Sequence, residues 1–330
     1  MKLIDYEELR FLVKESRDKK VLITFHSMGD TDAVASAIAL STYFTQSKVV
    51  MPDSISANSA RTLRKAGVSV ADIGTEFDDD ADMVVLLDVN NFEDCGPFRF
   101  RLEEFNGTII IMDHHAPKPV DKKDLYVYNN EYYNSASSIV YSVLESFGIH
   151  VSGETAKILL YGIISDSAEL RNATAETFVQ IGRLLKIVNE DYSEILQEMM
   201  HIADPNARAK TIEDIRGSKT EMLGNLLFLY GEAHSHANIA ADFAIKLGAD
   251  LSLFYSRNGS ELSFSARLRP PLDRRYGLHL GMVMKNVAPM VGCTGGGHPC
   301  AAGAYGPGTD PVAFLKLFRE RVVGKVEGKP

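Results

Sequence analysis

The sequence predicts an α/β protein: a parallel-sheet domain with helices on both faces, a helical linker, and a smaller mixed α/β C-terminal domain. Short runs rich in Val, Ile and Leu alternate with helix-like stretches through the first 190 residues. These runs show little polar–apolar alternation, which is typical of strands buried on both faces of a parallel sheet. Beyond residue 220 the pattern changes to alternating strands around a hairpin signal.

The first part of the chain repeats strand and helix in turn. The runs expected to form strands are 20–25, 48–51, 82–89 and 108–113. The stretches expected to form helices are 32–44, 56–67, 135–148, 153–164 and 175–188. Gly67 and Gly148 stand where two of these helices should end, because glycine adopts the left-handed conformation common there without strain. This order favours a βα-repeating sheet domain over residues 1–190.

The second part of the chain has a different pattern. Residues 191–220 are helical, polar and charged in character, and we interpret them as a linker. In residues 221–330 we expect a strand at 225–233, a helix at 236–248 and a hairpin at 249–269. Asn258-Gly259 is a strong signal for the turn of that hairpin. A helix at 277–292 then leads into the glycine-rich segment CTGGGHPCAAGAYGPG.

Composition narrows the class of protein. Of 330 residues, 45% are hydrophobic and 24% charged, which is ordinary for a soluble globular protein. No apolar run reaches the roughly 18 residues of a membrane span, so we expect no membrane partner. The charged N-terminus does not resemble a signal peptide, and three cysteines cannot form an even disulfide framework. We therefore expect a protein of the reducing cytoplasm.

The charge is distributed unevenly. The net charge of −9 argues against a protein that coats long nucleic acid. Residues 1–220 carry 23 basic and 35 acidic residues, a balance of −12, whereas residues 221–330 carry 12 and 9, a balance of +3. An acidic first part suits metal ions and a mildly basic second part suits a phosphorylated ligand, although ordinary variation of surface charge explains the difference equally well.

Side chains that can bind metal follow the predicted strands. They are His26, Asp30 and Asp32 after the first strand, Asp88 after the third, Asp113, His114 and His115 after the fourth, and Asp166 after a helix. Because the carboxyl ends of parallel strands meet at one edge of a sheet, we expect these residues to lie together. Each alone has a simpler explanation: Asp30 and Asp32 as helix N-caps, and either histidine as a hydrogen-bonded structural residue.

The set is large enough for two metal ions. Asp30 and Asp32, one residue apart in an extended loop, can serve different ions, and Asp88 can bridge them. Two ions roughly 3.5–4 Å apart stabilise both the attacking and the leaving oxygen of a phosphoryl displacement. Mixed carboxylate and imidazole ligation favours Mn²⁺, with Mg²⁺ or Co²⁺ as alternatives.

Five ordered segments resemble a known family. HSMGDTDAVAS, LLDV, MDHHAP and YGIISDS resemble the four motifs of the DHH phosphoesterase superfamily, and GGGHPCAAGA resembles the glycine-rich motif of the DHH-associated C-terminal domain. The first motif departs from the family at Gly29 and Ala35, where Pro and Gly are usual, and neither is a ligand position. Family II inorganic pyrophosphatases carry a different C-terminal domain, so the GGGH motif points away from them.

The resemblance implies roles for individual residues. One ion would be held by His26, Asp30 and Asp88, and a second by Asp32, Asp88, His114 and Asp166. Asp113 would orient the histidine pair and His115 would face the substrate phosphate, which makes these two the expected catalytic residues. A water or hydroxide between the ions would be the nucleophile.

The resemblance also implies a substrate-binding role for the second domain, which would close over the metal edge. Gly295, Gly296 and Gly297 would allow close approach of the backbone and offer N–H groups to phosphate. His298 and Arg267 would bind the substrate phosphate or the terminal nucleotide. Leu268 follows Arg267 where family members often have Ser, so one hydroxyl contact is missing.

Three functions stay open at this stage. The first is hydrolysis of very short oligonucleotides, of 3′-phosphoadenosine-5′-phosphate or of dinucleotides, and we favour it. The second is a RecJ-type single-strand exonuclease, for which the chain lacks a long basic groove with interleaved aromatics. The third is an inactive DHH scaffold of a replication complex, which would have no need of intact ligands. The sequence does not fix the oligomeric state, and a homodimer is compatible with it.

Overall fold

The structure is a computed structural model that describes residues 1–115, 118–199, 205–234, 236–307 and 310–328. The chain divides into two compact units, Met1–His201 and Ile202–Pro330, and each is described by itself. None of the helices within these described ranges is long and apolar enough to cross a membrane.

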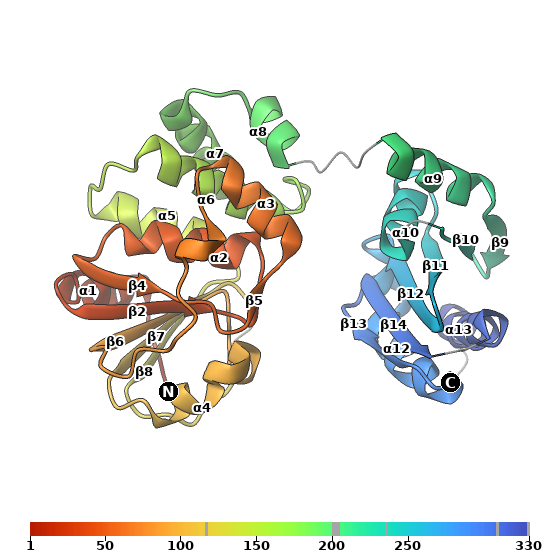
Figure 1. The fold of residues 1–330 in the computed structure, drawn as a ribbon, viewed down its shortest axis with the longest axis horizontal. Helices are drawn as coiled ribbons and strands as arrows, with labels where there is room; N and C mark the ends of the chain where they lie inside the picture. Colours follow the sequence, from red (N-terminus) through yellow and green to blue (C-terminus); the bar gives the residue numbers. More distant parts are fainter. Residues whose placement is uncertain (116–117, 200–204, 235, 308–309, 329–330) are drawn as a thin grey trace. The chain divides into compact units, whose positions relative to one another are not determined.

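The N-terminal unit is built on a six-stranded parallel sheet (Figure 1). The strand order is β1-β8-β7-β6-β2-β4, and every neighbouring pair runs parallel. The strands are β1 Lys2–Leu3, β2 Lys20–Phe25, β4 Gln46–Val49, β6 Met83–Leu87, β7 Thr108–Asp113 and β8 Leu125–Asn129. A separate parallel pair joins β3 Met28–Gly29 to β5 Ser54–Ile55. The predicted parallel-sheet fold is thus confirmed.

Helices cover both faces of this sheet, with α2, α5 and α6 on one face and α4 on the other (Figure 1). The α-helices of the unit are α1 Tyr6–Glu15, α2 Thr31–Ser41, α3 Ala57–Lys65, α4 Arg99–Glu104, α5 Ala136–Ser146, α6 Gly153–Asp166, α7 Ala175–Val188 and α8 Tyr192–Met199. Most begin at a side chain that accepts a hydrogen bond from the first turn, which satisfies one of its free N–H groups. These N-caps are Asp5, Asp30, Ser56, Ser135, Ser152 and Thr174.

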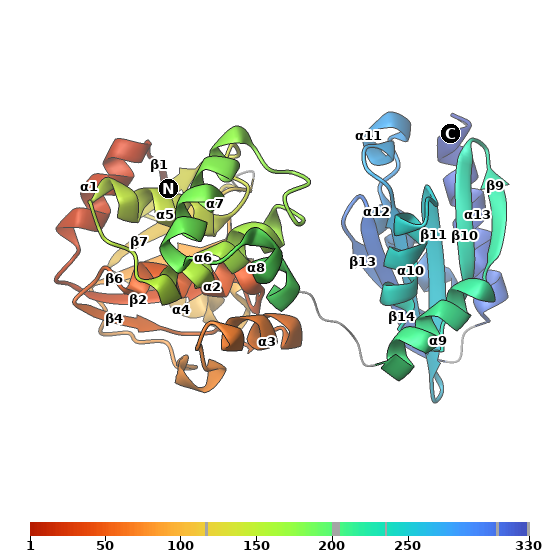
Figure 2. The same cartoon turned by 90° about the horizontal axis from the view of Figure 1, so that it is seen from above.

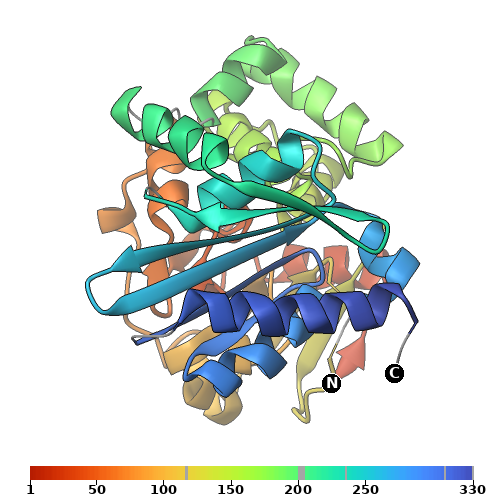
Figure 3. The ribbon, with the colours of Figure 1, turned by 90° about the vertical axis from the view of Figure 1, so that its right-hand side faces the viewer.

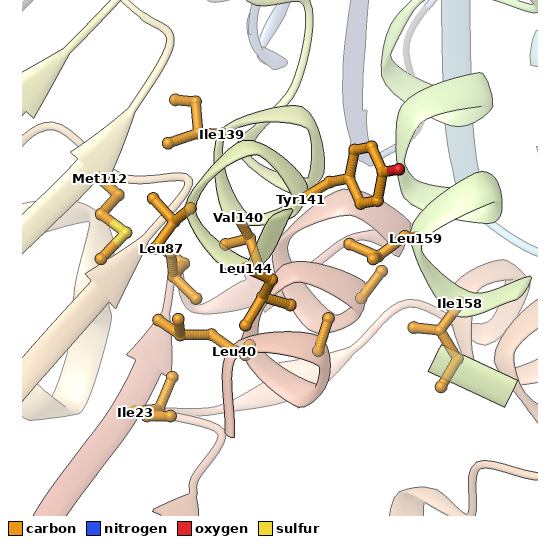
Figure 4. Close-up of a cluster of buried hydrophobic side chains, with 14 of the residues drawn as sticks. Ile23, Leu40, Leu87, Met112, Ile139, Val140, Tyr141, Leu144, Ile158 and Leu159 are labelled. Atoms are coloured by element: carbon orange, nitrogen blue, oxygen red, sulfur yellow. The ribbon is translucent and has the colours of Figure 1, made fainter. Parts of the chain in front are cut away.

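Successive residues of the central strands pack into two different cores. Ile23, Leu87 and Met112 face the core beneath α2 and α5, where Figure 4 shows them opposite Leu40 and Leu144. The residues between them in the strands point to a second core on the face that α4 covers. Full burial of one such side chain contributes about 1.5–3 kcal/mol, so both faces stabilise the sheet. This explains the uninterrupted apolar runs in the sequence.

The C-terminal unit contains a six-stranded mixed sheet in the order β13-β14-β12-β11-β10-β9 (Figure 2). Only β10 and β11 pair in parallel, and the crossover between them is α10. The strands are β9 Lys219–Leu223, β10 Leu226–Glu232, β11 Leu251–Asn258, β12 Glu261–Leu268, β13 Thr294–Gly297 and β14 Ala301–Pro307. The predicted hairpin is present, and Gly259 in its turn has a φ of 61°.

The two faces of this second sheet are covered differently. The helices are α9 Pro205–Arg216, α10 Ala237–Lys246, α11 Leu272–Tyr276, α12 Leu280–Val287 and α13 Pro311–Val326. Helices α12 and α13 cover one face, and α13 runs across the front of Figure 3. On this face Phe264 stacks on Phe314 with ring centroids 3.9 Å apart. Helix α10 packs on β11 and β12 of the other face through Ala240, Ala241 and Ala244.

Residues 191–220, which the sequence suggested as a linker, contain α8, α9 and the start of β9. Ile195 of α8 packs into the core of the N-terminal unit, and Ile215 of α9 packs against the α10 cluster of the C-terminal unit. Residues 200–204 lie outside the described part of the chain.

Candidate metal centre

Candidate ligands of the N-terminal unit meet at one edge of its sheet, from the ends of three adjacent strands and from two helices. The register pairs Phe25 with Leu87 and Leu87 with Met112, so the next residues, His26, Asp88 and Asp113, lie side by side. Because β2, β6 and β7 are parallel, all three lie at the carboxyl edge of the sheet. Asp30 and Asp32 reach this edge from the start of α2, and Asp166 is the last residue of α6.

Distances within the cluster are short. His26 Nε2 lies 3.8 Å from an Asp30 oxygen and 3.6 Å from an Asp88 oxygen. His114 Nε2 lies 3.3 Å from the other Asp88 oxygen and 3.0 Å from an Asp166 oxygen. One ligand atom from each of His26, Asp30 and Asp88 lies within 4.8 Å of the others, and the same holds for Asp32, His114 and Asp166. The structure thus brings together all six predicted ligands.

Asp88 occupies the centre of this cluster with an unusual backbone conformation. Its φ is 56°, in the left-handed region that few residues other than glycine adopt, although Asp tolerates it better than most. The turn comes directly after β6 ends at Leu87, and the Asp88 N–H donates to Met112 O at 3.2 Å. The side chain is 3% exposed, with one oxygen near His26 and the other near His114. This position suits a bridging ligand.

Asp32 is held by the start of another helix. Its two carboxylate oxygens accept hydrogen bonds from the Ala136 and Ser137 N–H groups of α5, at 2.6 and 2.9 Å. The residue is fully buried, and Gly162 of α6 lies against it so closely that a Cβ there would be 2.9 Å from Asp32 Oδ1. Of the two predicted N-caps, Asp30 does cap α2 by accepting from the Ala33 N–H, whereas Asp32 lies inside α2 and accepts from the first turn of α5, whose own N-cap is Ser135.

Asp113 positions the histidine pair. Its Oδ1 accepts from the His114 backbone N–H at 2.8 Å and lies 2.9 Å from His115 Nδ1. Because Nδ1 contacts Asp113, Nε2 is the ring nitrogen that His115 can offer to a ligand, and the side chain is 54% exposed. Asn129 Nδ2 donates to the His115 carbonyl and so fixes the backbone of the same segment. Ala116 and Pro117, at the end of the MDHHAP motif, lie outside the described residues.

The charges of the cluster are strongly coupled. Burial would lower the pKa of His26 and of His114, but the neighbouring carboxylates outweigh it and raise these values to about 10 and about 11. Burial raises the pKa of Asp32 well above its usual range, and the nearby Asp88 and Asp166 raise it further. Burial also opposes the charge of Asp88, but His114 and His26 hold its pKa below the usual range.

Unsatisfied buried atoms indicate that a cation fits this cluster. Among the described residues, Asp88 Oδ1, Asp113 Oδ2 and His114 Nε2 are buried without a hydrogen bond of good geometry, although His114 Nε2 has the close contacts to Asp88 and Asp166 given above. Such atoms are costly unless something neutralises them. Divalent ions held here would activate a water and stabilise the charge of a phosphate. The oxygen and imidazole donors match the expectation from the sequence.

In the C-terminal unit, Arg267 and the glycine motif lie on neighbouring strands. Arg267 of β12 is opposite Ala301 of β14, and the Leu268 N–H donates to Cys300 O. The Arg267 side chain is engaged: Nε contacts Asp242 of α10 at 2.6 Å, and Nη1 donates to Ser265 Oγ and Ala266 O. No described residue accepts a hydrogen bond from Nη2.

The three glycines of the motif differ in their surroundings. A Cβ at Gly295 would meet the Met284 carbonyl of α12 at 2.8 Å, and one at Gly297 would meet Ala301 O at 2.6 Å. Only Gly296 has open space where its side chain would be. His298 is exposed, and its carbonyl accepts from the Gly281 N–H of α12. A side chain at Gly295 or Gly297 would therefore meet neighbouring backbone, whereas one at Gly296 would not.

Comparison with known proteins identifies both units. Residues 20–163 match the DHH family, N-terminal domain, and residues 226–324 match the DHHA1 domain. The chain belongs to the DHH phosphoesterase superfamily. Known relatives in this superfamily include metal-dependent hydrolases, which agrees with the clustered ligands of the DHH unit.

Three relatives illustrate the range of the superfamily. The uncharacterized protein MJ0988 of Methanocaldococcus jannaschii is 26% identical over 94% of each chain. A probable manganese-dependent inorganic pyrophosphatase of Lactobacillus delbrueckii subsp. bulgaricus is 24% identical over 60% of this chain and 64% of its own length. The crystal structure of an exopolyphosphatase-related protein from Bacteroides fragilis has a TM-score of 0.77, with 17% identity and 97% of each chain covered. Its identity is too low to carry more than the fold.

Several residues that shape the DHH site were not found from the sequence. Gly162 lies in the YGIISDS segment, where its contact with Asp32 is not apparent. The N–H groups of Ala136 and Ser137 belong to a helix that was predicted, but a backbone contact over a hundred residues leaves no local signal. In the DHHA1 domain, Tyr305 follows the glycine motif and is 59% exposed. Its position becomes informative only with the sheet register.

Proposed function

We propose that this DHH phosphoesterase hydrolyses very short oligonucleotides and small nucleotides such as 3′-phosphoadenosine-5′-phosphate, with two Mn²⁺ ions held by His26, Asp30, Asp32, Asp88, His114 and Asp166. Metal-dependent hydrolysis is the activity named for a relative of this chain, the probable manganese-dependent inorganic pyrophosphatase. The observation that supports a nucleotide substrate is one face of the DHHA1 sheet, which combines a cation, an aromatic ring and a floor of small residues.

This substrate face consists of the rows of β12, β14 and β13 that point toward the α10 side. Even-numbered residues of β12 and β14 are buried with α12 and α13, so the odd-numbered ones face the other way. The register then places side by side Arg267 with Ala301, Ser265 with Gly303 and Gly296, and Ser263 with Tyr305 and Thr294. Since Gly296 and Gly303 have no side chains, backbone is accessible to a ligand between the arginine and the tyrosine.

The two ends of the substrate face have complementary chemistry. Arg267 Nη2 offers N–H groups to a phosphate, and charge-assisted hydrogen bonds of this kind are the stronger ones. Tyr305 presents an exposed ring on which a base can stack. Arg267 pairs with Ala301 of β14, and Tyr305 lies four positions further along β14. At about 3.4 Å per residue, this places the two side chains about 14 Å apart along the strand direction. A cation and an aromatic ring at this spacing suit a short nucleotide chain, whereas inorganic pyrophosphate has no base to use the ring.

The pyrophosphatase and exopolyphosphatase relatives make inorganic phosphates the substrates to exclude. A substrate panel distinguishes the possibilities: labelled oligomers from 2 to 20 nucleotides, 3′-phosphoadenosine-5′-phosphate, pyrophosphate and tripolyphosphate, each with Mn²⁺. We expect faster turnover on dimers to pentamers than on 20-mers. Preference for either inorganic substrate, or processive degradation of the 20-mer as in a RecJ-type enzyme, would contradict the proposal. No hydrolysis of any substrate by the metal-loaded protein would favour the scaffold.

Variants of the substrate face test its role. Base stacking is worth about 1–3 kcal/mol per base by alanine substitution, so Tyr305→Ala should weaken binding of oligonucleotides by about 5- to 150-fold. Tyr305→Phe keeps the ring and should behave like the wild type. Phe243→Ala removes an exposed aromatic that belongs to α10 and not to these rows, and it is the matched control. Equal KM values for Tyr305→Ala and wild type would show that Tyr305 does not stack on a base of the substrate.

A further inference from the structure

The hydrogen bonds of Asn134 connect two separate parts of the metal centre. Asn134 directly precedes Ser135, the N-cap of α5, and α5 holds Asp32 through its first N–H groups. Across the site, Asp166 ends α6 and is followed by a loop that leads to Thr174, the N-cap of α7. The side chain of Asn134 binds this loop at three points.

All three contacts have good geometry. Asn134 Nδ2 donates to Asn172 O at 2.8 Å, and its Oδ1 accepts from the Thr174 N–H at 3.1 Å and from the Thr177 hydroxyl at 2.7 Å. One amide therefore joins the start of α5, the start of α7 and the loop after α6. Long-range contacts of this kind fix the relative positions of three elements that are separate in sequence.

The loop held by Asn134 has a backbone that needs support. Ala168, Glu169 and Leu170 have φ values of 52°, 57° and 69°, so three successive residues other than glycine are left-handed. Such residues cost of order 1–3 kcal/mol each and persist only where their surroundings hold them. Ser167, which is buried beside Asp166, closes the loop from within by accepting from the Leu170 N–H and through its carbonyl from the Asn172 N–H.

We propose that Asn134 is a positioning residue for the ion held by Asp32, His114 and Asp166. The hydrogen bonds of its side chain go to Asn172, Thr174 and Thr177, and none of these is a candidate ligand. It sets the α5 N-terminus, which orients Asp32, against the loop that orients Asp166. His26 and Asp30 belong to the β2–α2 segment, which makes no hydrogen bond with Asn134 in the described residues. The inference rests on the metal centre of the proposed function and is independent of the substrate.

The test is a metal titration without substrate. Calorimetry with Mn²⁺ is carried out on the wild type, Asn134→Ala and two reference variants, Asp166→Asn and Asp30→Asn, each of which weakens one ligand set. Loss of a residue that orients a metal ligand without itself binding the metal typically lowers metal affinity 10- to 100-fold. We expect about a tenfold loss for Asn134→Ala, confined to the ion that Asp166→Asn also weakens.

Two further variants separate positioning from general stability. Asn172→Ala removes an exposed side chain but keeps the carbonyl that Asn134 binds, so it should retain wild-type affinity. Asn134→Asp keeps the acceptor for Thr174 and Thr177 but loses the donor, and it serves if the alanine variant does not fold. Wild-type affinity for Mn²⁺ in Asn134→Ala or, if that variant is unfolded, in Asn134→Asp would overturn the proposal. A loss that instead matches Asp30→Asn would do the same.

Discussion

Gly162 of α6 provides a test of how tightly the metal centre is packed. In Gly162→Ala the new Cβ would lie 2.1 Å from Ser137 Oγ, 2.9 Å from Ser137 Cβ and 2.9 Å from Asp32 Oδ1. Asp32 cannot simply rotate away, because two backbone N–H groups hold its carboxylate. Overpacking of this kind costs typically about 1–3 kcal/mol, whereas replacing glycine by alanine within a helix gains about 1 kcal/mol. The net expectation is a loss of about 0–2 kcal/mol in unfolding free energy.

Gly182 of α7 is the matched control. It lies within a helix of the same 14-residue length, and a Cβ there meets nothing within 4 Å. Gly182→Ala should therefore show the helix-propensity gain alone, about 1 kcal/mol. The difference between the two variants, about 1–3 kcal/mol, isolates the clash from the propensity. Urea denaturation of the metal-free proteins measures it, with the slope of the transition checked for constancy.

Manganese affinity is a second test of the Gly162→Ala variant. If α5 and α6 move apart to accommodate the methyl group, Asp32 moves with α5 and manganese affinity should fall by about 10- to 100-fold, as for lost support of other ligands. Gly182→Ala should bind manganese like the wild type. If Gly162→Ala were as stable as Gly182→Ala and bound manganese equally well, the close packing described for Asp32 would be incorrect.

Three other predictions follow from the same geometry. Asp88→Asn keeps a side chain that tolerates a φ of 56° and should remain folded, but hydrolysis should fall to background and bound manganese should decrease; wild-type turnover would exclude a bridging role. In the metal-free protein the carboxylates raise the pKa of His26 to about 10 and that of His114 to about 11. The contribution of the two protonated histidines to the free energy of unfolding is therefore complete below about pH 6.5 and is lost as pH rises through 10 to 11. Urea titrations across that range should show falling stability, and manganese uptake at pH 7 should release protons, detectable by calorimetry in buffers of different ionisation enthalpy. Arg267→Ala and His298→Ala should keep wild-type metal content by elemental analysis while losing activity on nucleotides; metal loss in His298→Ala would argue against separate roles for the two units.

Local patterns in the sequence predicted most of the N-terminal elements. The bounds expected for β2, β7 and α7 agree with the structure, and β6 ends before Asp88 because the chain turns there. Strand β8, with the sequence LYVYN, was missed although its tyrosines and valine favour a strand, because the run is only five residues long and directly follows a charged segment. Helix α13 was also missed, although Phe314, Phe318 and Val322 repeat every four residues and are buried.

The candidate ligands His26, Asp88 and His114 were predictable because they follow strand ends, where a parallel sheet brings side chains together. The contacts that surround these ligands were not predictable from the sequence. The bonds from α5 to Asp32, the space that Gly162 leaves and the contacts of Asn134 all join segments far apart in the sequence. Their residue types, a glycine in a helix and an asparagine before a serine, are common in other settings. Only the packed structure distinguishes them.

The order of the candidate ligands along the chain also determines when each metal site could be complete during synthesis. His26 emerges early in synthesis, whereas Asp166, in the same cluster, comes after the strands β2, β6, β7 and β8 in the chain. Parallel pairings between distant segments form slowly, because their loops must close first. A nascent chain that stops before α6 lacks one ligand and the packing of Gly162 against Asp32. An ion held by Asp32, His114 and Asp166 would therefore bind fully only after α6 has packed, whereas His26, Asp30 and Asp88 are complete earlier in the chain.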